Sequence, residues 1–233
     1  MVFLYQQNVT YSFEIYTCYD YRVGVLCLPE INTHWEQEGQ AGALRQLFQD
    51  VWKASCIQTS RAPKPFLSTY QPGGTVTAVC ENWVSRIIGT GEDHLGLGRW
   101  TYATQRGRGD KKVTIITAYN ASITSGDGPF FQQQMRLLSR LHRQQQNFSL
   151  PAPRRQLVLD LQAWIEHLQR EGHSIILALE AKETYDLDKN LPSPHPLVFQ
   201  SGKFTIDAKH DRQFSRLISI CKLSLPLAMQ HTT

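Results

Sequence analysis

The spacing of apolar residues along the chain changes character several times, and one stretch stands out. Residues 175–179 are all apolar (IILAL), follow shortly after Gly172, and end abruptly in Glu180, Lys182 and Glu183. An apolar run bounded by turn signals predicts a buried strand, with the charges at the edge of its sheet. In open α/β sheets, ligands bind at the ends of such strands. We therefore expect Glu180 and Lys182 to lie in any active site.

Three longer segments place apolar residues three or four positions apart, the spacing of a helix with one buried face. They cover residues 41–56, 129–146 and 153–171. The last of them is the best defined, because Pro153 suits the first turn of a helix and Gly172 suits the position just past its end. This helix leads directly into the strand described above.

Short β-branched or aromatic runs between Gly, Pro and charged turns predict strands. These runs cover residues 2–9, 22–28, 66–70, 74–79, 98–105 and 112–119. A hairpin loop is expected at 106–110, a loop with one short strand at 184–211, and a weak helix at 214–220. Strands and helices that come in blocks rather than in βαβ alternation predict two packed sheets with helices outside, which is a layered α/β sandwich.

Composition narrows the class of protein only slightly. Hydrophobic residues make up 41% and charged residues 19% of the chain, and the net charge of +4 permits an anionic partner without requiring one. The five scattered cysteines form no C-x-x-C pair, which argues against a disulfide framework and a zinc knuckle. With neither a signal peptide nor a run long enough for a membrane span, we expect an intracellular protein, nuclear or cytoplasmic, that is not secreted.

Polar residues end three of the predicted strands. Glu30 follows the run at 22–28, Tyr119 and Asn120 end the run at 112–119, and Glu180 ends the run at 175–179. A carboxylate at the end of a strand is a typical oxygen ligand for Mg²⁺, and Tyr and Asn can donate hydrogen bonds to a phosphate. Taken singly, each of these residues is better explained by a strand that meets solvent, because strand ends are routinely polar, and only the three together favour a site.

Four segments together resemble the endonuclease/exonuclease/phosphatase family of metal-dependent phosphodiesterases. They are VLCLPE at 25–30, GGTVTAV at 73–79, VTIITAY at 113–119, and the helix at 154–171 followed by the strand at 174–183. Residues 31–35 (INTHW) continue the first segment in the style of retrotransposon endonucleases. The resemblance implies a four-layer α/β sandwich, in which two mixed β-sheets are flanked by helices, formed by a single domain over residues 1–233.

The resemblance also implies roles for particular residues. Glu30 would bind Mg²⁺ or Mn²⁺ with support from Asn8, and Tyr119 would hydrogen-bond the scissile phosphate. Glu180 and Lys182 stand where the family has an Asp-x-Asn that activates water and positions the phosphate. Glu is one methylene longer than Asp, and Lys replaces an amide with a cation that lacks an acceptor. The family's final strands, with their Asp-His pair, have no counterpart after residue 223, so we expect the domain to be incomplete at its C-terminus.

Three functions remain open at this point. The first is a Mg²⁺-dependent endonuclease that acts on the phosphate backbone of DNA, or alternatively RNA. The second is an inactive relic or fragment of a mobile-element endonuclease, with at most nucleic-acid binding, and the third is a phosphatase for small phosphate esters. A basic hairpin tip formed by Arg106, Arg108, Lys111 and Lys112 is compatible both with a nucleic-acid contact and with a solvated loop.

Overall fold

A computed structural model describes residues 2–4, 24–33, 39–60, 72–121, 129–146, 152–180 and 197–198. The expectations for Asn8, Lys182, residues 66–70 and residues 214–220 lie outside these ranges. The strands are β1 (Val2–Leu4), β2 (Val25–Pro29), β3 (Ser55–Thr59), β4 (Thr75–Cys80), β5 (Ile87–Glu92), β6 (Trp100–Arg106), β7 (Lys112–Tyr119), β8 (His173–Glu180) and β9 (Leu197–Val198). The helices are α2 (Gln40–Val51), the 3-10 helix η1 (Glu81–Arg86), α3 (Pro129–Gln144) and α4 (Pro153–Arg170).

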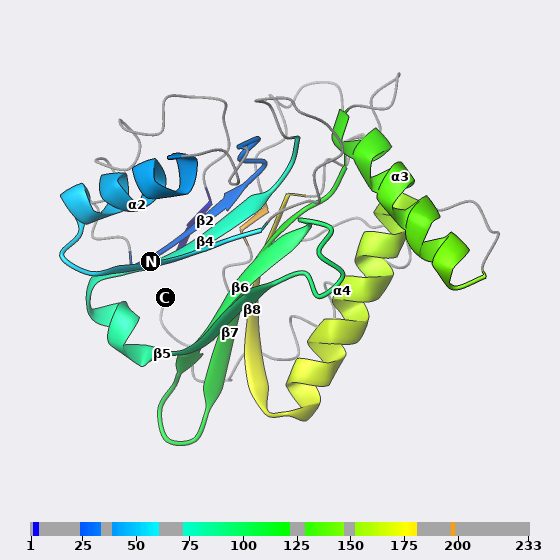
Figure 1. Ribbon diagram of the computed structural model, residues 1–233. Helices are drawn as coiled ribbons and strands as arrows, with labels where there is room; N and C mark the ends of the chain where they lie inside the picture. The colour runs from blue at the N-terminus through cyan, green and yellow to red at the C-terminus, as the bar shows by residue number, and fades with distance from the viewer. Residues whose placement is uncertain are drawn as a thin grey trace, which may run out of the picture.

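The strands form two mixed sheets (Figure 1). The order is β1-β2-β4-β3 in one sheet and β5-β6-β7-β8-β9 in the other. The pairs β1/β2 and β7/β8 are parallel, and every other neighbouring pair is antiparallel. The parallel β7/β8 pair is joined through α3 and α4, as a parallel connection requires.

Helices cover the outer faces of both sheets, which gives four layers. Phe48 and Trp52 pack against the first sheet, at α2 and just after it, and Leu161 and Ile165 of α4 pack against the second. A third cluster lies between the sheets and comprises Val25, Cys27, Val79, Ala103, Ile115 and Ala178. The predicted four-layer α/β sandwich is therefore confirmed. No helix among the described residues is long and apolar enough to cross a membrane.

Several predicted elements differ from the structure at the edges of the sheets. The helix predicted over residues 41–56 ends at Val51, and Trp52 is already extended, so that Ser55 begins β3. The sequence also failed to indicate β5, whose two glycines interrupt its apolar pattern. Both β3 and β5 are edge strands, and most of their residues are only partly buried. An edge strand lacks the continuous apolar signal that a buried strand carries.

Threonine hydroxyls bridge the two sheets toward one end of the sandwich. The Oγ1 atom of Thr77 in β4 lies 2.8 Å from that of Thr101 in β6 and 2.7 Å from that of Thr117 in β7. The Thr75 hydroxyl adds a contact of 3.2 Å to Thr101. All four threonines are fully buried, so each hydroxyl needs a partner. Hydrogen bonds across the inter-sheet layer therefore fix how the two sheets align at this end.

The Cys27 thiol, which hydrogen-bonds Thr117, predicts a pH dependence of stability. Burial raises the pKa of the Cys27 thiol from 9.0 to about 11, although the hydrogen bond to Thr117 opposes part of this rise. A raised pKa in the folded state means that the contribution to stability is complete below pH 9 and is lost as pH rises toward 11. Urea unfolding at pH 8 and pH 10 should show an extra loss of about 1 kcal/mol that Cys27→Ala lacks. An equal loss in both proteins would contradict this prediction.

Candidate active site

The ends of β7 and β8 place a tyrosine beside a glutamate. Tyr119 and Glu180 occupy the same register position in these parallel strands, and they are only 3% and 4% exposed. Strand alternation places Tyr119 on the same face as Thr117, whose hydroxyl reaches the other sheet, and Glu180 on the same face as Ala178 of the inter-sheet cluster. The Asn120 N–H donates to the Glu180 carbonyl at 2.9 Å. Both side chains therefore face the end of the inter-sheet space.

The end of β2 reaches the same edge from the opposite sheet. Pro29, the last residue of β2, pairs with Thr75. The Thr75 hydroxyl contacts Thr101 across the sandwich, and Thr101 pairs with Thr117, two residues before the end of β7. Glu30 follows Pro29 directly. The structure thus brings the ends of β2, β7 and β8 to one edge, as the three polar strand ends in the sequence predicted.

The backbone turns at Glu30, directly after β2. Both Glu30 (φ 51°) and Asn32 (φ 55°) adopt left-handed conformations, which are strained for a residue such as Glu. Hydrogen bonds hold this turn to the glycine pair before β4. The N–H groups of Ile31 and Asn32 donate to the Gly74 and Gly73 carbonyls, and the Gly73 N–H donates to Asn32 Oδ1 at 2.8 Å. Such strain concentrates at functional sites.

One glycine of this pair, Gly73, lies against an aromatic ring that packs on the candidate tyrosine. The rings of Phe130, in α3, and Tyr119 lie 5.0 Å apart at an angle of 44°. A Cβ atom at Gly73 would lie 2.2 Å from the Phe130 ring, and Gly73 has a φ of 78°. Gly73 therefore allows the Glu30 turn and the Tyr119 ring to approach each other.

Replacing Gly73 with Ala should destabilise the protein by more than the conformational cost of left-handed backbone, which is about 1–3 kcal/mol, because Phe130 must also move. Gly109→Ala is the matched control, since Gly109 has a φ of 66° but a Cβ atom there would meet nothing within 4 Å. Thermal unfolding of both variants separates strain from steric clash. Equal losses of stability would show that the Phe130 contact contributes nothing.

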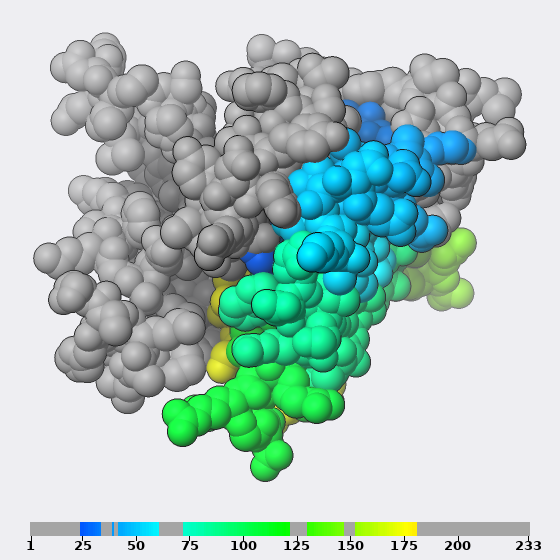
Figure 2. Space-filling view, turned by 90° about the vertical axis from the view of Figure 1, so that its left-hand side faces the viewer, coloured from blue at the N-terminus to red at the C-terminus, as the bar shows by residue number. Residues whose placement is uncertain are grey.

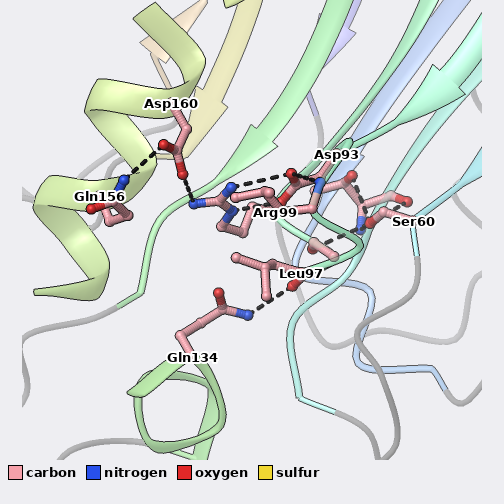
Figure 3. Close-up of polar contacts among 10 residues, drawn as sticks. Ser60, Asp93, Leu97, Arg99, Gln134, Gln156 and Asp160 are labelled. Atoms are coloured by element: carbon pink, nitrogen blue, oxygen red, sulfur yellow. Dashed lines mark hydrogen bonds and ion pairs between the residues drawn. The ribbon is translucent and has the colours of Figure 1, made fainter. Parts of the chain in front are cut away.

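A buried ionic network connects helix α4 to the end of β7, the strand that carries Tyr119 (Figure 3). Arg99, which precedes β6, is bound to Asp93 by its Nε and Nη2 atoms at 2.5 and 3.1 Å. Its Nη1 atom contacts Asp160 of α4 at 2.7 Å, and Gln156 donates to the same carboxylate. The Arg99 carbonyl accepts from the Tyr119 N–H at 2.9 Å. Arg99 thereby connects α4 to the strand end that carries Tyr119.

Two further side chains hold the loop that carries Arg99. Ser60 Oγ donates to the Gly98 carbonyl at 3.2 Å, and Gln134 Nε2 of α3 donates to the Leu97 carbonyl at 2.7 Å (Figure 3). Ser60 directly follows β3 of the first sheet, and Gln134 lies on a helix, so parts of three layers of the sandwich meet at this loop. The loop is therefore a fixed support for the site rather than an independent turn.

The donor chemistry of this edge fits a hard divalent cation. Glu30 carries carboxylate oxygens directly after β2, and Mg²⁺ is commonly held by only one or two carboxylates together with water and substrate phosphate. Among the described residues, no group of three or more His, Cys, Asp or Glu side chains is placed to hold a metal. Asn8 and Lys182, the remaining predicted site residues, lie outside the described ranges.

Sequence reasoning missed the residues that position the site. Asn32 carried a usable signal, because Asn tolerates left-handed backbone and stands two residues after a predicted metal ligand. Asp93 and Arg99 carried none, because charged residues in a Gly-rich stretch predict a solvated turn. Their burial depends on Asp160, which is 61 residues away from Arg99 in the chain.

Comparisons with solved structures identify known proteins with a similar fold. No family model matches the sequence, and a search of curated proteins gives no match. Among solved structures, the catalytic domain of APE2 from Xenopus laevis matches with a TM-score of 0.50 and 14% identity, over 83% of this chain and 62% of that one. An endonuclease/exonuclease/phosphatase family protein from Leptotrichia buccalis matches with a TM-score of 0.38 and 12% identity, over 61% and 62%. Truncated TDP2 from Caenorhabditis elegans matches with a TM-score of 0.42 and 11% identity, over 78% and 58%.

The chain therefore has the fold of the APE2 catalytic domain, which is the endonuclease/exonuclease/phosphatase fold that the sequence motifs predicted. At these identities the similarity concerns the fold and not the reaction. The chain also spans less than two thirds of the length of each of the three structures. The groups that bear on the reaction are the side chains at the ends of β2, β7 and β8.

Proposed function

We propose that this protein is a metal-dependent phosphodiester hydrolase of the endonuclease type, which acts on DNA or alternatively RNA and derives from a retrotransposon endonuclease. The observation that carries the proposal is the convergence of Glu30, Tyr119 and Glu180 at one edge of a sandwich with the endonuclease/exonuclease/phosphatase fold. Carboxylates beside a hydrogen-bond donor are the groups that phosphate-ester hydrolysis needs.

Each of these residues has a distinct role in the proposal. Glu30, supported by Asn8, would hold Mg²⁺ or Mn²⁺, which when bound offsets the negative charge of the phosphate. The Tyr119 hydroxyl donates a hydrogen bond to a non-bridging phosphate oxygen. Glu180 accepts a proton from a water molecule as the water oxygen bonds to phosphorus and the bond to the leaving sugar oxygen breaks. The leaving oxygen takes up a proton from solvent water. Lys182 contacts the phosphate as a cation.

A second candidate function is an inactive relic that retains nucleic-acid binding. The observation that favours it is Glu180 itself, because this side chain is one methylene longer than Asp and is fixed at a buried strand end. A buried position gives the longer side chain little freedom to adjust, and a misplacement of about 1 Å in a preorganised site can cost roughly a hundredfold in rate. Lys182 would add a charge that competes with the metal for Glu180 or Glu30.

Nicking of supercoiled DNA separates these candidates. The assay compares the natural chain with the double variant Glu180→Asp/Lys182→Asn, each in Mg²⁺ and in EDTA. Mg²⁺-dependent nicking by the natural chain supports the hydrolase, and nicking by the double variant alone supports the relic. No cleavage by either protein would overturn the hydrolase proposal, and release of phosphate from small esters without DNA cleavage would point to a phosphatase instead.

A further inference from the structure

A cleft lined by arginines lies at the opposite end of the second sheet from the candidate active site. Its volume is about 380 Å³, and it is lined by Ser85, Arg86, Arg106, Gly107 and Arg108. These residues come from the end of η1 and from the hairpin between β6 and β7. Figure 2 shows this region uncovered at the lower end of the molecule, where the green hairpin projects beside the blue-green atoms of η1 and β5.

The strand directions place this cleft far from Tyr119. Strand β7 begins at Lys112, which pairs with Arg106 at the cleft, and ends at Tyr119. A strand of 8 residues spans about 23 Å at roughly 3.3 Å per residue. A ligand in the arginine cleft would therefore not touch the reacting groups at the other end of β7. The proposed hydrolase function does not use this cleft.

The cleft gathers three arginines that have no carboxylate partner among the described residues. Among the residues that the structure describes, the ion pairs involve Arg99 and His167 but none of the three cleft arginines. Arg106 stands directly opposite Lys112 in the β6/β7 ladder, and like charges in that position destabilise a sheet. An anion bound between these strands would relieve the repulsion.

An exposed aromatic ring adjoins the cleft. The guanidinium of Arg86 lies 5.2 Å from the centre of the Trp83 ring, and Trp83 is 42% exposed despite its size. Arginine forks match phosphate oxygens, and aromatic side chains beside a basic groove are typical of sites for single strands. Because the arginines line a hollow, they suit a narrow polyanion better than the flat surface of a lipid bilayer.

We propose that the arginine cleft, defined by Arg86, Arg106 and Arg108, is a second nucleic-acid site that binds the phosphate backbone of a single strand beside Trp83. The site is separate from the candidate active site and goes beyond the proposed hydrolase function. Its role is to hold a strand without reading its sequence, because guanidinium contacts to phosphate carry no base information.

Fluorescence anisotropy with a labelled single-stranded DNA tests this site. The triple variant Arg86→Gln/Arg106→Gln/Arg108→Gln is compared with Arg45→Gln/Arg140→Gln/Arg143→Gln, which removes the same charge from exposed positions on α2 and α3. We expect the cleft variant to bind at least about tenfold more weakly at low salt, and its slope of log K against log salt to fall by about 2. The control should stay within about threefold of the natural chain.

All measurements are made in EDTA, so the binding result does not depend on cleavage of the DNA. The test of the arginine cleft therefore remains valid even if the protein is not a hydrolase. Equal losses in the two triple variants would overturn the site, because they would reveal a general charge effect. Tighter binding to phosphatidylserine vesicles than to DNA would also overturn it, in favour of a membrane contact. The cleft variant should unfold at a temperature no lower than the natural chain does in low salt, since the Arg106→Gln change removes the repulsion at Lys112.

Discussion

Replacing Arg99 with Met should destabilise the protein by about 3–5 kcal/mol, because it leaves a buried carboxylate without its cation. The Arg99 side chain is 2% exposed, and that of Asp93, its partner at 2.5 Å, is fully buried. Water cannot take over the role of the guanidinium at such a position. Urea unfolding of Arg99→Met and the natural chain at pH 7 measures the loss directly.

Two further variants show whether the charge is the cause. Asp160→Asn should cost clearly less than Arg99→Met, because the Asp160 side chain is 15% exposed and its neutral amide still accepts a hydrogen bond. Asp93→Asn combined with Arg99→Met should recover part of the stability, since no unpaired charge then remains at the Asp93 position. If Arg99→Met costs less than about 1 kcal/mol, the typical net contribution of one hydrogen bond, the network does not support the site.

Replacing Glu30 with Gln should lower the affinity for Mn²⁺ by at least about 10- to 100-fold, the loss that follows even when an indirect partner of a metal ligand is removed. The amide keeps the size of the side chain but removes the negative charge. Calorimetric titration of the natural chain and the variant measures this difference. Glu166→Gln is the control, because Glu166 lies on α4 and hydrogen-bonds Gln162. Unchanged affinity in Glu30→Gln would remove Glu30 from the proposed site.

The parts of the fold that the sequence predicted are those with strong local signals. Strand β7 is continuously apolar or β-branched after its first residue and lies inside its sheet, so its bounds were predicted correctly. Helix α4 has Pro153 at its start and Gly172 just past its end, and its apolar stripe packs on β8. The edge strands β3 and β5 lacked such signals, because their residues are only partly buried.

In the candidate site, too, the sequence predicted what has a local signal and missed what depends on distant contacts. The positions of Glu30, Tyr119 and Glu180 at strand ends were predicted because strand ends follow from the local pattern, while their roles stay a proposal. The sequence did not indicate the buried contacts that hold these strand ends in place. The contact between Arg99 and Asp160 joins a loop to a helix that follows much later in the chain, and no spacing within the sequence specifies such a pair.

Paramagnetic broadening by Mn²⁺ in an NMR spectrum of the natural chain tests most directly whether the strand ends form one metal site. We predict that substoichiometric Mn²⁺ removes the amide signals of Tyr119, Asn120 and Glu180 first. The signals of Gly107 and Gly109, in the hairpin at the far end of β7, should persist in the same sample. Broadening that begins at the hairpin, or that affects all of these signals equally, would contradict a metal site at the ends of β2, β7 and β8.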